Sequence, residues 1–311
     1  MKVVLLCPGQ GAQRVGMGKD LAERFPAARE VFEAVDEALG FGLSRLAWDG
    51  PEADLTLTHN AQPAILAHTL AVHAAVGDRL QPVAAAGHSL GEYSAYATAG
   101  SLALADAARL VRRRGELMLE AGRGRPGTMA AVLGLAGEAV GDACREASAA
   151  GEVAVAANFN APDQTVISGD PAAVERAGER CKAAGAKRVL PLKVSGAFHS
   201  PLMAPAQEDL KAELERVAFA DPRFPVIANA AAQPARDAKT ARRLLGEQLT
   251  APVRWVEGMR MAAEVAGSGV TFLEMGPGSV LTGLVKRILP QAAALSLATA
   301  DDVERFLEQA A

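Results

Sequence analysis

The sequence predicts an α/β protein, in which a parallel sheet covered by helices is interrupted by a smaller domain with a different element order. Length is the first observation, because 311 residues suffice for two domains of about 100–200 residues each. Composition is the second, since 50% apolar and 22% charged residues are typical of a folded chain with a large core. The third is the alternation of short apolar runs with helical patterns, which favours a parallel sheet.

The N-terminal part supplies strands and helices for that sheet. Residues 3–6 form an apolar run that predicts a buried strand, and a glycine-rich turn, Pro8-Gly9-Gln10-Gly11-Ala12-Gln13, follows it. A second run at 83–86 predicts another buried strand. Pro63 suits the start of a helix that continues to Val76. Further helical patterns cover residues 18–25, 28–39, 92–99 and 104–121.

The element order changes in the middle of the chain. Residues 122–127 are rich in glycine and predict a linker. The next segments predict strand, helix, strand, strand, helix and strand: 129–135, 138–149, 153–158, 165–168, 171–184 and 188–194. That order is the ferredoxin-like split βαβ unit. We therefore expect a small domain at 125–196, inserted into a large α/β domain made of residues 1–124 and 197–311. Short strands at 226–228 and 271–274 belong to the second part of that large domain.

Charge and composition exclude several classes of function. The net charge of −4 argues against a general nucleic-acid or membrane-surface binder, and an aromatic content of 4% argues against a base-stacking platform. No uncharged apolar run reaches the roughly 18 residues that a membrane-spanning helix needs. Cys7, Cys144 and Cys181 match no zinc spacing and no disulfide framework, which indicates a reducing compartment. We expect a cytoplasmic protein.

A serine stands at the centre of the motif Gly87-His88-Ser89-Leu90-Gly91. The motif fits the pattern G-x-S-x-G and lies between a predicted strand and a predicted helix, the setting of a nucleophile elbow. Glycines allow the sharp turn, and a helix start supplies free N–H groups, including that of Leu90, for an oxyanion. The alternative is that Ser89 simply caps the helix, and the pattern alone does not decide between the two.

A serine nucleophile needs a base, and histidine is the usual choice at neutral pH. His199 is the favoured candidate, because it follows the inserted domain and would lie where the two domains meet. The other histidines suit the role less well. His88 should point away from Ser89 on a tight turn, His68 and His73 suit packing or surface positions, and His59 lies in a polar stretch before Asn60. The sequence identifies no acidic third member of a triad, so a backbone carbonyl could orient the imidazole instead.

Arg114 belongs to the basic run Arg112-Arg113-Arg114 but differs in its helical position. It lies three or four residues from Leu110, Val111 and Met118, on the apolar stripe, whereas its two basic neighbours are expected on the exposed face. A guanidinium that points inward needs an anion, and its planar fork suits a carboxylate. Arg114 therefore either grips a substrate carboxylate near Ser89 or forms a buried ion pair with an internal acid.

With these residues considered together, the chain strongly resembles the malonyl-CoA:acyl carrier protein transacylases of fatty acid synthesis, and more widely the acyltransferase domains of polyketide synthases. The resemblance covers nearly the whole length and rests on six segments: 8–13, 87–95, Arg114-Gly115, Asn158-Phe159-Asn160, Phe198-His199 and Glu274-Met275-Gly276-Pro277-Gly278. It implies an α/β-hydrolase-like core with a ferredoxin-like insertion, in agreement with the element order above.

The resemblance also implies a role for each matching residue. Ser89 would be the acylated nucleophile, His199 its base and Arg114 the group that holds the malonyl carboxylate. The N–H groups of Gln10 and Leu90 would form the oxyanion hole. Gln248 would orient the histidine through its main-chain carbonyl. Asn158 and Asn160 would lie at the CoA entrance, and the bulky Phe198 would disfavour an α-methyl group on the substrate.

The implied activity is malonyl transfer from malonyl-CoA to the phosphopantetheine thiol of acyl carrier protein, by a ping-pong route through malonyl-serine. No bound metal or cofactor is expected, and the family default is a monomer. Docking of an acidic carrier should need local positive charge, for which the candidates are Lys187, Arg188, Lys193, Arg123 and Arg125. Three alternatives remain: a trans-acting polyketide acyltransferase, a serine esterase or thioesterase, and a non-enzymatic docking module.

Overall fold

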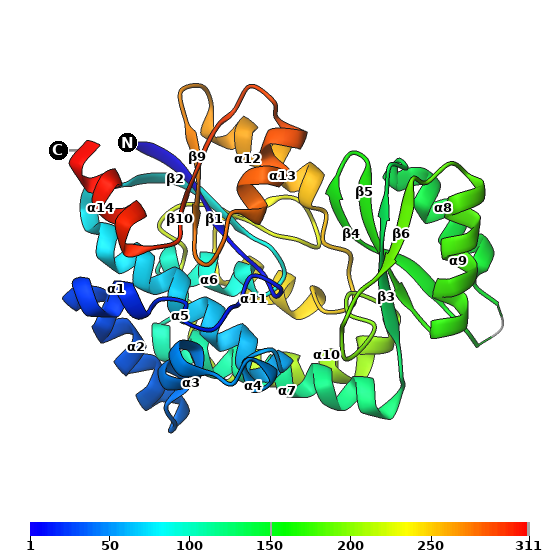
Figure 1. Ribbon diagram of the computed structural model, residues 1–311, viewed down its shortest axis with the longest axis horizontal. Helices are drawn as coiled ribbons and strands as arrows, with labels where there is room; N and C mark the ends of the chain where they lie inside the picture. The colour runs from blue at the N-terminus through cyan, green and yellow to red at the C-terminus, as the bar shows by residue number, and fades with distance from the viewer. Residues whose placement is uncertain (150, 310–311) are drawn as a thin grey trace.

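A computed structural model describes residues 1–149 and 151–309, which form two α/β bodies side by side (Figure 1). The larger body is built on a six-stranded sheet whose strands come from both ends of the chain: β1 (Lys2–Cys7), β2 (Gln81–Gly87), β7 (Val226–Ile227), β8 (Pro234–Ala235), β9 (Thr271–Met275) and β10 (Ala293–Leu297). Their spatial order is β10-β9-β1-β2-β7-β8. All neighbours are parallel except β7 and β8, which confirms the predicted parallel sheet.

Helices cover both faces of this sheet, as a parallel sheet requires. The large body contains 3-10 turns and helices with the following bounds: α1 (Lys19–Arg24), α2 (Pro26–Leu39), α3 (Leu43–Asp49), α4 (Glu52–Leu55), α5 (Thr58–Val76), η1 (Gly77–Arg79), α6 (Gly91–Thr98), α7 (Leu104–Gly124), η2 (Pro201–Met203), α10 (Ala204–Glu215), α11 (Ala238–Glu247), α12 (Trp255–Ala266), α13 (Val280–Ile288) and α14 (Ala300–Gln309). Among the residues that the structure describes, no helix is both long and apolar enough to cross a bilayer.

Strand β1 shows how the sequence divides the core. Side chains alternate between the two faces of a strand. Val3 and Leu5 accordingly join the cluster formed with α2, α5 and α7, whereas Val4 and Leu6 join the cluster formed with α12 and α13. A strand buried on both faces reads as a continuous apolar run, which is why this strand could be predicted from the sequence.

Two predicted helix boundaries are wrong. Helix α5 begins at Thr58, so Pro63 lies inside the helix rather than at its start. A proline has no N–H for the carbonyl four residues earlier, that of His59, and this carbonyl accepts a hydrogen bond from Nη1 of Arg112 at 3.1 Å instead. Arg112 is consequently only partly exposed, contrary to expectation, and its Nε also pairs with Oε1 of Glu116 at 2.8 Å.

The second correction concerns α7, which continues to Gly124 and so occupies half of the predicted linker. Gly122 explains this, because a Cβ there would lie 2.2 Å from the carbonyl oxygen of Ser195. The glycine is therefore needed for the close approach of the helix to that loop, and it does not end the helix.

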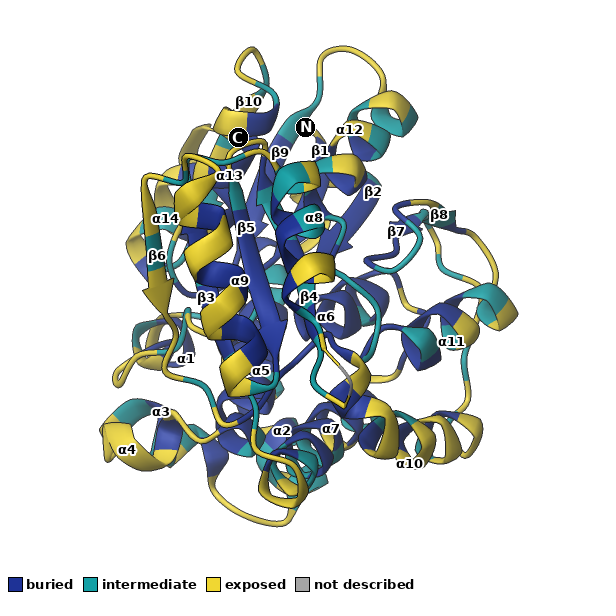
Figure 2. Cartoon of the chain, turned by 90° about the vertical axis from the view of Figure 1, so that its right-hand side faces the viewer, coloured by how far each residue is buried: buried dark blue, intermediate teal, exposed yellow. Residues whose placement is uncertain are grey.

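The smaller body contains a four-stranded antiparallel sheet and two helices: β3 (Thr128–Leu133), α8 (Gly137–Ala147), β4 (Ala154–Ala161), β5 (Gln164–Gly169), α9 (Pro171–Ala183) and β6 (Arg188–Pro191). The strand order β4-β5-β3-β6 is that of the ferredoxin-like unit, as predicted. Helices α8 and α9 lie against one face of this sheet (Figure 2). Ala130 and Val132 belong to the core cluster on that face, whereas Met129 belongs to the core cluster of the larger body. Strand β6 ends at Pro191, three residues before the predicted end.

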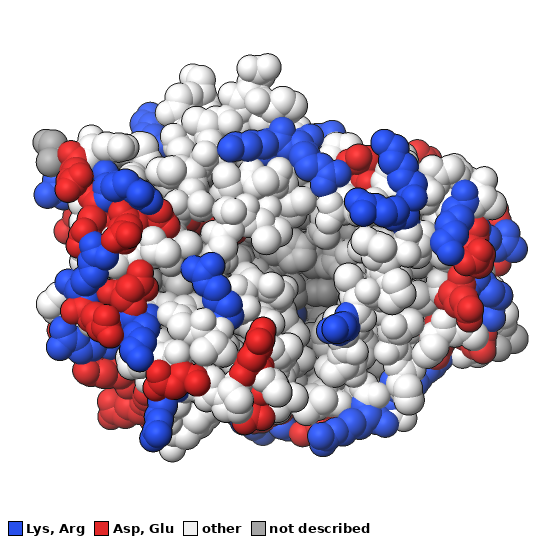
Figure 3. All heavy atoms as spheres, in the orientation of Figure 1, with Lys and Arg blue, Asp and Glu red and all other residues white. Residues whose placement is uncertain are grey.

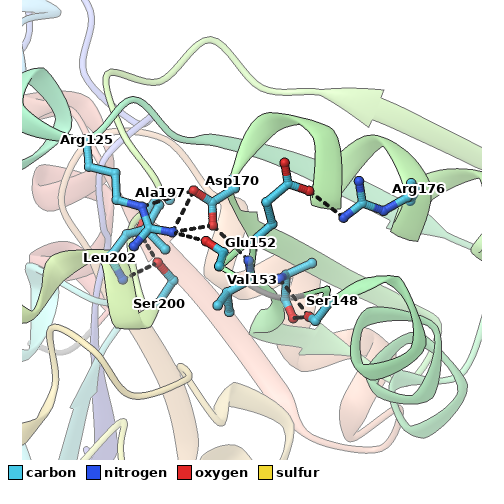
Figure 4. Close-up of polar contacts among 11 residues, drawn as sticks. Arg125, Ser148, Glu152, Val153, Asp170, Arg176, Ala197, Ser200 and Leu202 are labelled. Atoms are coloured by element: carbon cyan, nitrogen blue, oxygen red, sulfur yellow. Dashed lines mark hydrogen bonds and ion pairs between the residues drawn. The ribbon is translucent and has the colours of Figure 1, made fainter.

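Arg125 lies where the chain enters the smaller body, and its side chain is held by that body (Figure 4). Its guanidinium donates to both carboxylate oxygens of Asp170 at 2.8–3.0 Å. Asp170 in turn accepts from the N–H of Val153 at 2.7 Å. The charge of Arg125 is therefore compensated within the fold.

Candidate active site

Ser89 lies in the turn between β2 and α6, at the carboxyl end of the central strands. Its φ of 54° is a left-handed conformation, which is uncommon for a residue with a side chain. The two flanking glycines make the turn possible. A Cβ on Gly87 would lie 1.9 Å from the backbone of Gly91, and a Cβ on Gly91 would lie 2.1 Å from the carbonyl oxygen of Cys7. The motif thus forms the sharp strand-to-helix turn that the sequence predicted.

Amide side chains from two distant loops hold the main chain of Ser89. The N–H of Ser89 donates to Oδ1 of Asn229 at 2.7 Å. The carbonyl oxygen of Ser89 accepts from Nε2 of Gln248 at 3.0 Å. Nδ2 of Asn229 also donates to the carbonyl oxygen of Gly87 at 2.7 Å. These contacts fix the strained conformation and direct the hydroxyl outward.

His199 approaches that hydroxyl from the other side. Its Nε2 lies 2.8 Å from Oγ of Ser89, and its Nδ1 lies 3.1 Å from the carbonyl oxygens of both Gln248 and Ala251. Two carbonyl acceptors require the proton to be on Nδ1, so the lone pair of Nε2 faces the serine. Burial, followed by the charges of Arg114 and His88, lowers the pKa of His199 to about 3. The imidazole is therefore neutral at pH 7 and able to accept a proton.

Arg114 reaches the same hydroxyl from the protein interior. The side chain is 1% exposed, and its guanidinium donates to three neutral oxygens: Oε1 of Gln62 at 2.8 Å, Oε1 of Gln248 at 2.9 Å and Oγ of Ser89 at 2.9 Å. Within the described part of the chain, no carboxylate lies within 4.0 Å of this guanidinium. The alternative of a buried ion pair is therefore wrong, and the guanidinium contacts neutral oxygens instead.

A cavity of about 660 Å³ opens beside the serine and the histidine, between the two bodies. Figure 3 shows it as a hollow in this face of the molecule. Four of the other predicted site residues line it: Gln10, Asn158, Asn160 and Phe198. Lys193 also lines the cavity and is exposed. Apolar and polar side chains both line the cavity, a mixture that suits an organic ligand carrying polar groups.

The positions of the individual wall residues refine the predictions. Oδ1 of Asn160 lies 2.8 Å from Nε2 of His88, so this nitrogen of His88 is engaged by the amide. Nε2 of Gln10 donates to Oγ1 of Thr58 at 3.2 Å. Leu90 is fully buried at the start of α6. The assignment of an oxyanion hole to the N–H groups of Gln10 and Leu90 remains a prediction.

Three residues of the site were missed by the sequence analysis: Gln62, Glu92 and Asn229. Gln62 offered only a weak signal: it is a polar residue directly before the apolar run of α5, but Thr58, His59 and Asn60 precede it. Glu92 offered another, because Ser89 and Glu92 have the spacing of a helix capping box. Its carboxylate turns elsewhere, however, and accepts from the N–H of Asn229 at 3.0 Å and from Nε2 of Gln248 at 2.7 Å.

Metal coordination finds little support in the side chains present. Over residues 1–149 and 151–309, no group of three or more His, Cys, Asp and Glu side chains is arranged to hold a metal ion. The polar groups around Ser89 are an imidazole, a guanidinium, amides and one buried carboxylate. This set suits activation of a hydroxyl and binding of an anion.

Comparisons with known proteins agree with this geometry. The model of the acyl transferase domain family matches residues 4–305. The malonyl CoA-acyl carrier protein transacylase of Bacillus subtilis (strain 168) is 43% identical over 308 residues, which is 99% of this chain and 96% of that protein. The protein of the same name from Escherichia coli (strain K12) is 44% identical over 293 residues, which is 93% of this chain and 94% of that protein.

Solved structures agree as well. An acyl carrier protein S-malonyltransferase from Vibrio cholerae superposes with a TM-score of 0.92 at 41% identity, covering 98% of this chain and 99% of that one. A malonyl-transacylase in complex with its type II polyketide synthase acyl-carrier protein gives a TM-score of 0.93 at 42% identity, covering 99% and 100%. The chain therefore belongs to the acyl transferase family, among the malonyl CoA-acyl carrier protein transacylases.

Proposed function

We propose that this chain transfers a malonyl group from malonyl-CoA to the phosphopantetheine thiol of an acyl carrier protein, through a malonyl-serine intermediate. The observation that carries the proposal is the convergence of three groups on one oxygen. Oγ of Ser89 lies 2.8 Å from Nε2 of His199 and 2.9 Å from Nη2 of Arg114. A hydroxyl, a neutral imidazole and a cation without a carboxylate in direct contact, at these distances, can activate a nucleophile and hold a substrate carboxylate at the same place.

The first half-reaction forms the ester. Nε2 of His199 takes the proton of the Ser89 hydroxyl while Oγ attacks the thioester carbonyl carbon. We assign the N–H groups of Gln10 and Leu90 to the oxyanion, an interaction typically worth about 2.7–4 kcal/mol per donor. The C–S bond then breaks, and the CoA sulfur leaves with the proton held by His199. Malonyl-Ser89 remains in the site.

The second half-reaction reverses these steps with a different thiol. The phosphopantetheine thiol gives its proton to His199, and its sulfur attacks the malonyl-serine carbonyl. The ester C–O bond breaks, and Oγ of Ser89 recovers the proton from His199. Because CoA leaves before the carrier thiol reacts, ping-pong kinetics are expected.

Arg114 gives the site a preference for dicarboxylic acyl groups. A malonyl carboxylate would compensate the buried guanidinium, whereas an acetyl group would leave it unpaired, and a site with an unpaired buried polar group rejects such an analogue strongly. The ring of Phe198 forms part of the cavity wall, next to His199 in the sequence. We propose that this ring disfavours an α-methyl group, and that Asn158 and Asn160 contact the CoA or pantetheine chain.

The proposed carrier is acidic, so a basic docking surface is expected at the mouth of the cavity. Lys187, Arg188 and Lys193 are exposed on the smaller body. Arg125, in contrast, is compensated by Asp170 and is less suited to docking. Lys and Arg side chains stand along part of the rim of the hollow (Figure 3). On the evidence of composition and family resemblance, we further propose a cytoplasmic monomer without a bound metal or cofactor.

A second candidate function is supply of malonyl groups to a polyketide assembly line. It is supported by the similarity to the malonyl-transacylase that was solved with its type II polyketide synthase acyl-carrier protein. The chemistry at Ser89 would be the same, and only the carrier would differ.

Loading of a phosphopantetheinylated carrier from a panel of acyl-CoAs, read by mass spectrometry, tests the proposal. We expect malonyl loading to exceed acetyl and methylmalonyl loading, with a fatty acid carrier and a polyketide carrier compared side by side. Hydrolysis of malonyl-CoA that persists in the presence of carrier thiol would indicate an esterase instead. No transfer to any carrier would contradict the proposal.

A further inference from the structure

Glu92 is a buried carboxylate beneath the catalytic groups, and the mechanism above does not use it. The side chain is fully buried on α6. Its Oε2 accepts both hydrogen bonds described above, from Asn229 and from Gln248, whereas its Oε1 has no partner among the described residues. Burial of a carboxylate costs folding free energy, so a carboxylate beneath an active site is expected to have a role there.

The side-chain amide of Gln248 could adopt two orientations that have the same shape but opposite polarity. In the observed orientation, Oε1 faces the donor-only guanidinium of Arg114 at 2.9 Å, and Nε2 faces Glu92 and the carbonyl oxygen of Ser89. A flipped amide would turn its NH2 group toward Arg114 and its oxygen toward two acceptors. Glu92, together with the carbonyl oxygen of Ser89, therefore determines which end of the amide faces the guanidinium.

Asn229 is the second residue that Glu92 holds. Its N–H donates to the carboxylate, and its side chain then accepts from the N–H of Ser89 and donates to the carbonyl oxygen of Gly87. Through Asn229 and Gln248, one carboxylate oxygen is connected to both main-chain polar atoms of Ser89. The same oxygen is connected, through Gln248, to Arg114.

We propose that Glu92 is a positioning residue for the transfer proposed above: by accepting from Asn229 and Gln248, it orients the amides that aim Arg114 and Ser89 at the malonyl group. Position 92 then needs a hydrogen-bond acceptor and does not need a negative charge. This requirement agrees with the surroundings of Glu92. Burial raises the pKa of Glu92 to about 7, and this effect exceeds the lowering caused by the hydrogen bonds from Gln248 and Asn229 and by the charge of Arg114. Tyr93 and Tyr96 are the other titratable side chains beside it.

Two substitutions separate the acceptor from its charge. Glu92→Gln keeps a carbonyl oxygen that can accept from both donors, and its NH2 group would take the place of the unpartnered Oε1. Glu92→Leu removes this acceptor: Nε2 of Gln248 then keeps only the carbonyl oxygen of Ser89, and the N–H of Asn229 loses its partner, so both amides are held less firmly. Gln248→Met is a third variant, which removes the amide but keeps the main-chain carbonyl that His199 contacts.

The measurement is the ratio of kcat/KM for malonyl-CoA to kcat/KM for acetyl-CoA, with a phosphopantetheinylated carrier as acceptor. Because both substrates are measured on the same preparation, the ratio does not depend on the folded fraction. We expect Glu92→Gln to keep the wild-type ratio within about twofold, and Glu92→Leu and Gln248→Met to lower it about tenfold or more, the size of one lost buried hydrogen bond.

An unchanged ratio in Glu92→Leu would overturn the inference, and so would a loss in Glu92→Gln equal to that in Glu92→Leu. Where Glu92→Leu does not fold, an unchanged ratio in Gln248→Met would have the same meaning. Wild-type protein that transfers no malonyl group would contradict the proposed function itself, which separates the two failures.

Discussion

Nη2 of Arg114 donates to Oγ of Ser89 across 2.9 Å, so the candidate anion clamp and the candidate nucleophile are in direct contact. A hydroxyl can accept one hydrogen bond while it donates another, and Ser89 therefore serves Arg114 and His199 together. A malonyl carboxylate would replace the hydroxyl oxygen as the acceptor of this guanidinium. Binding of the substrate would then bring the acyl group to the nucleophile.

Arg114→Ala should reduce malonyl transfer far more than acetyl transfer. We expect the ratio of the two kcat/KM values to fall about a hundredfold, since a fully desolvated charge pair is worth about 2–5 kcal/mol. Arg113→Ala is the matched control, because Arg113 is half-exposed on the same helix and pairs with Glu116 and Glu120. Equal losses of malonyl and acetyl transfer in Arg114→Ala would refute the clamp.

The pH dependence of acylation should reflect a histidine that is neutral throughout the physiological range. Burial lowers the pKa of His199 to about 3, and the neutral form is the active base. Activity would then be lost only as the pH falls through this lowered pKa. We expect the rate of malonyl-serine formation in single-turnover experiments to show no inflection near the ordinary histidine pKa of about 6.5. A tenfold loss per pH unit below about 6.5 would contradict this expectation.

Glu92→Gln should change how stability depends on pH. Burial raises the folded-state pKa of Glu92 from 4.5 to about 7, so between these values the folded protein holds a proton that the unfolded chain has released. The contribution of Glu92 to the free energy of unfolding is complete below the unfolded pKa and is lost as the pH rises through the folded pKa. Glutamine has no such dependence.

Chemical denaturation of both proteins on either side of this window tests the sign. We expect the variant to gain stability relative to wild type when the pH is raised from below 4.5 to above the folded pKa of about 7. His199 contributes equally to both proteins and cancels in the comparison. A constant difference across this range would show that Glu92 does not titrate in the window.

Charge reversal on the smaller body should weaken carrier binding without affecting the chemistry. For the double variant Lys187→Glu and Arg188→Glu, we expect a raised KM for the carrier and an unchanged rate of malonyl-serine formation, because the two residues do not line the cavity. Lys2→Glu is the control, an exposed charge at the N-terminal end of β1, on the larger body. Equal effects of the control and the double variant would remove these residues from the docking surface.

The catalytic candidates could be predicted because each follows a local rule. Ser89 lies between Gly87 and Gly91, and the sharp turn requires glycine at both positions because a Cβ there would collide with backbone atoms. Arg114 is a charged residue on the apolar stripe of α7. The fold followed from apolar runs and from the element order of the insertion. His199 was chosen by its place after the insertion, and the structure brings it to Ser89.

The remaining parts of the site depend on tertiary contacts that no local pattern encodes. Gln62, Asn229 and the side chain of Gln248 come from three distant segments, and an isolated amide says little in the sequence about what it will contact. The start of α5 was mispredicted for a similar reason. The carbonyl that Pro63 leaves without a helical donor is satisfied by Arg112, which lies on another helix.

Intact-mass measurement after incubation with malonyl-CoA, without carrier, tests the central claim most directly. Wild-type protein should gain one malonyl group, and subsequent addition of phosphopantetheinylated carrier should remove it. Ser94→Ala should behave like wild type, since the Ser94 hydroxyl has no hydrogen-bond partner in the described structure. Ser89→Ala should gain no mass. A malonyl adduct on Ser89→Ala, or an adduct on wild type that the carrier thiol cannot remove, would contradict the account.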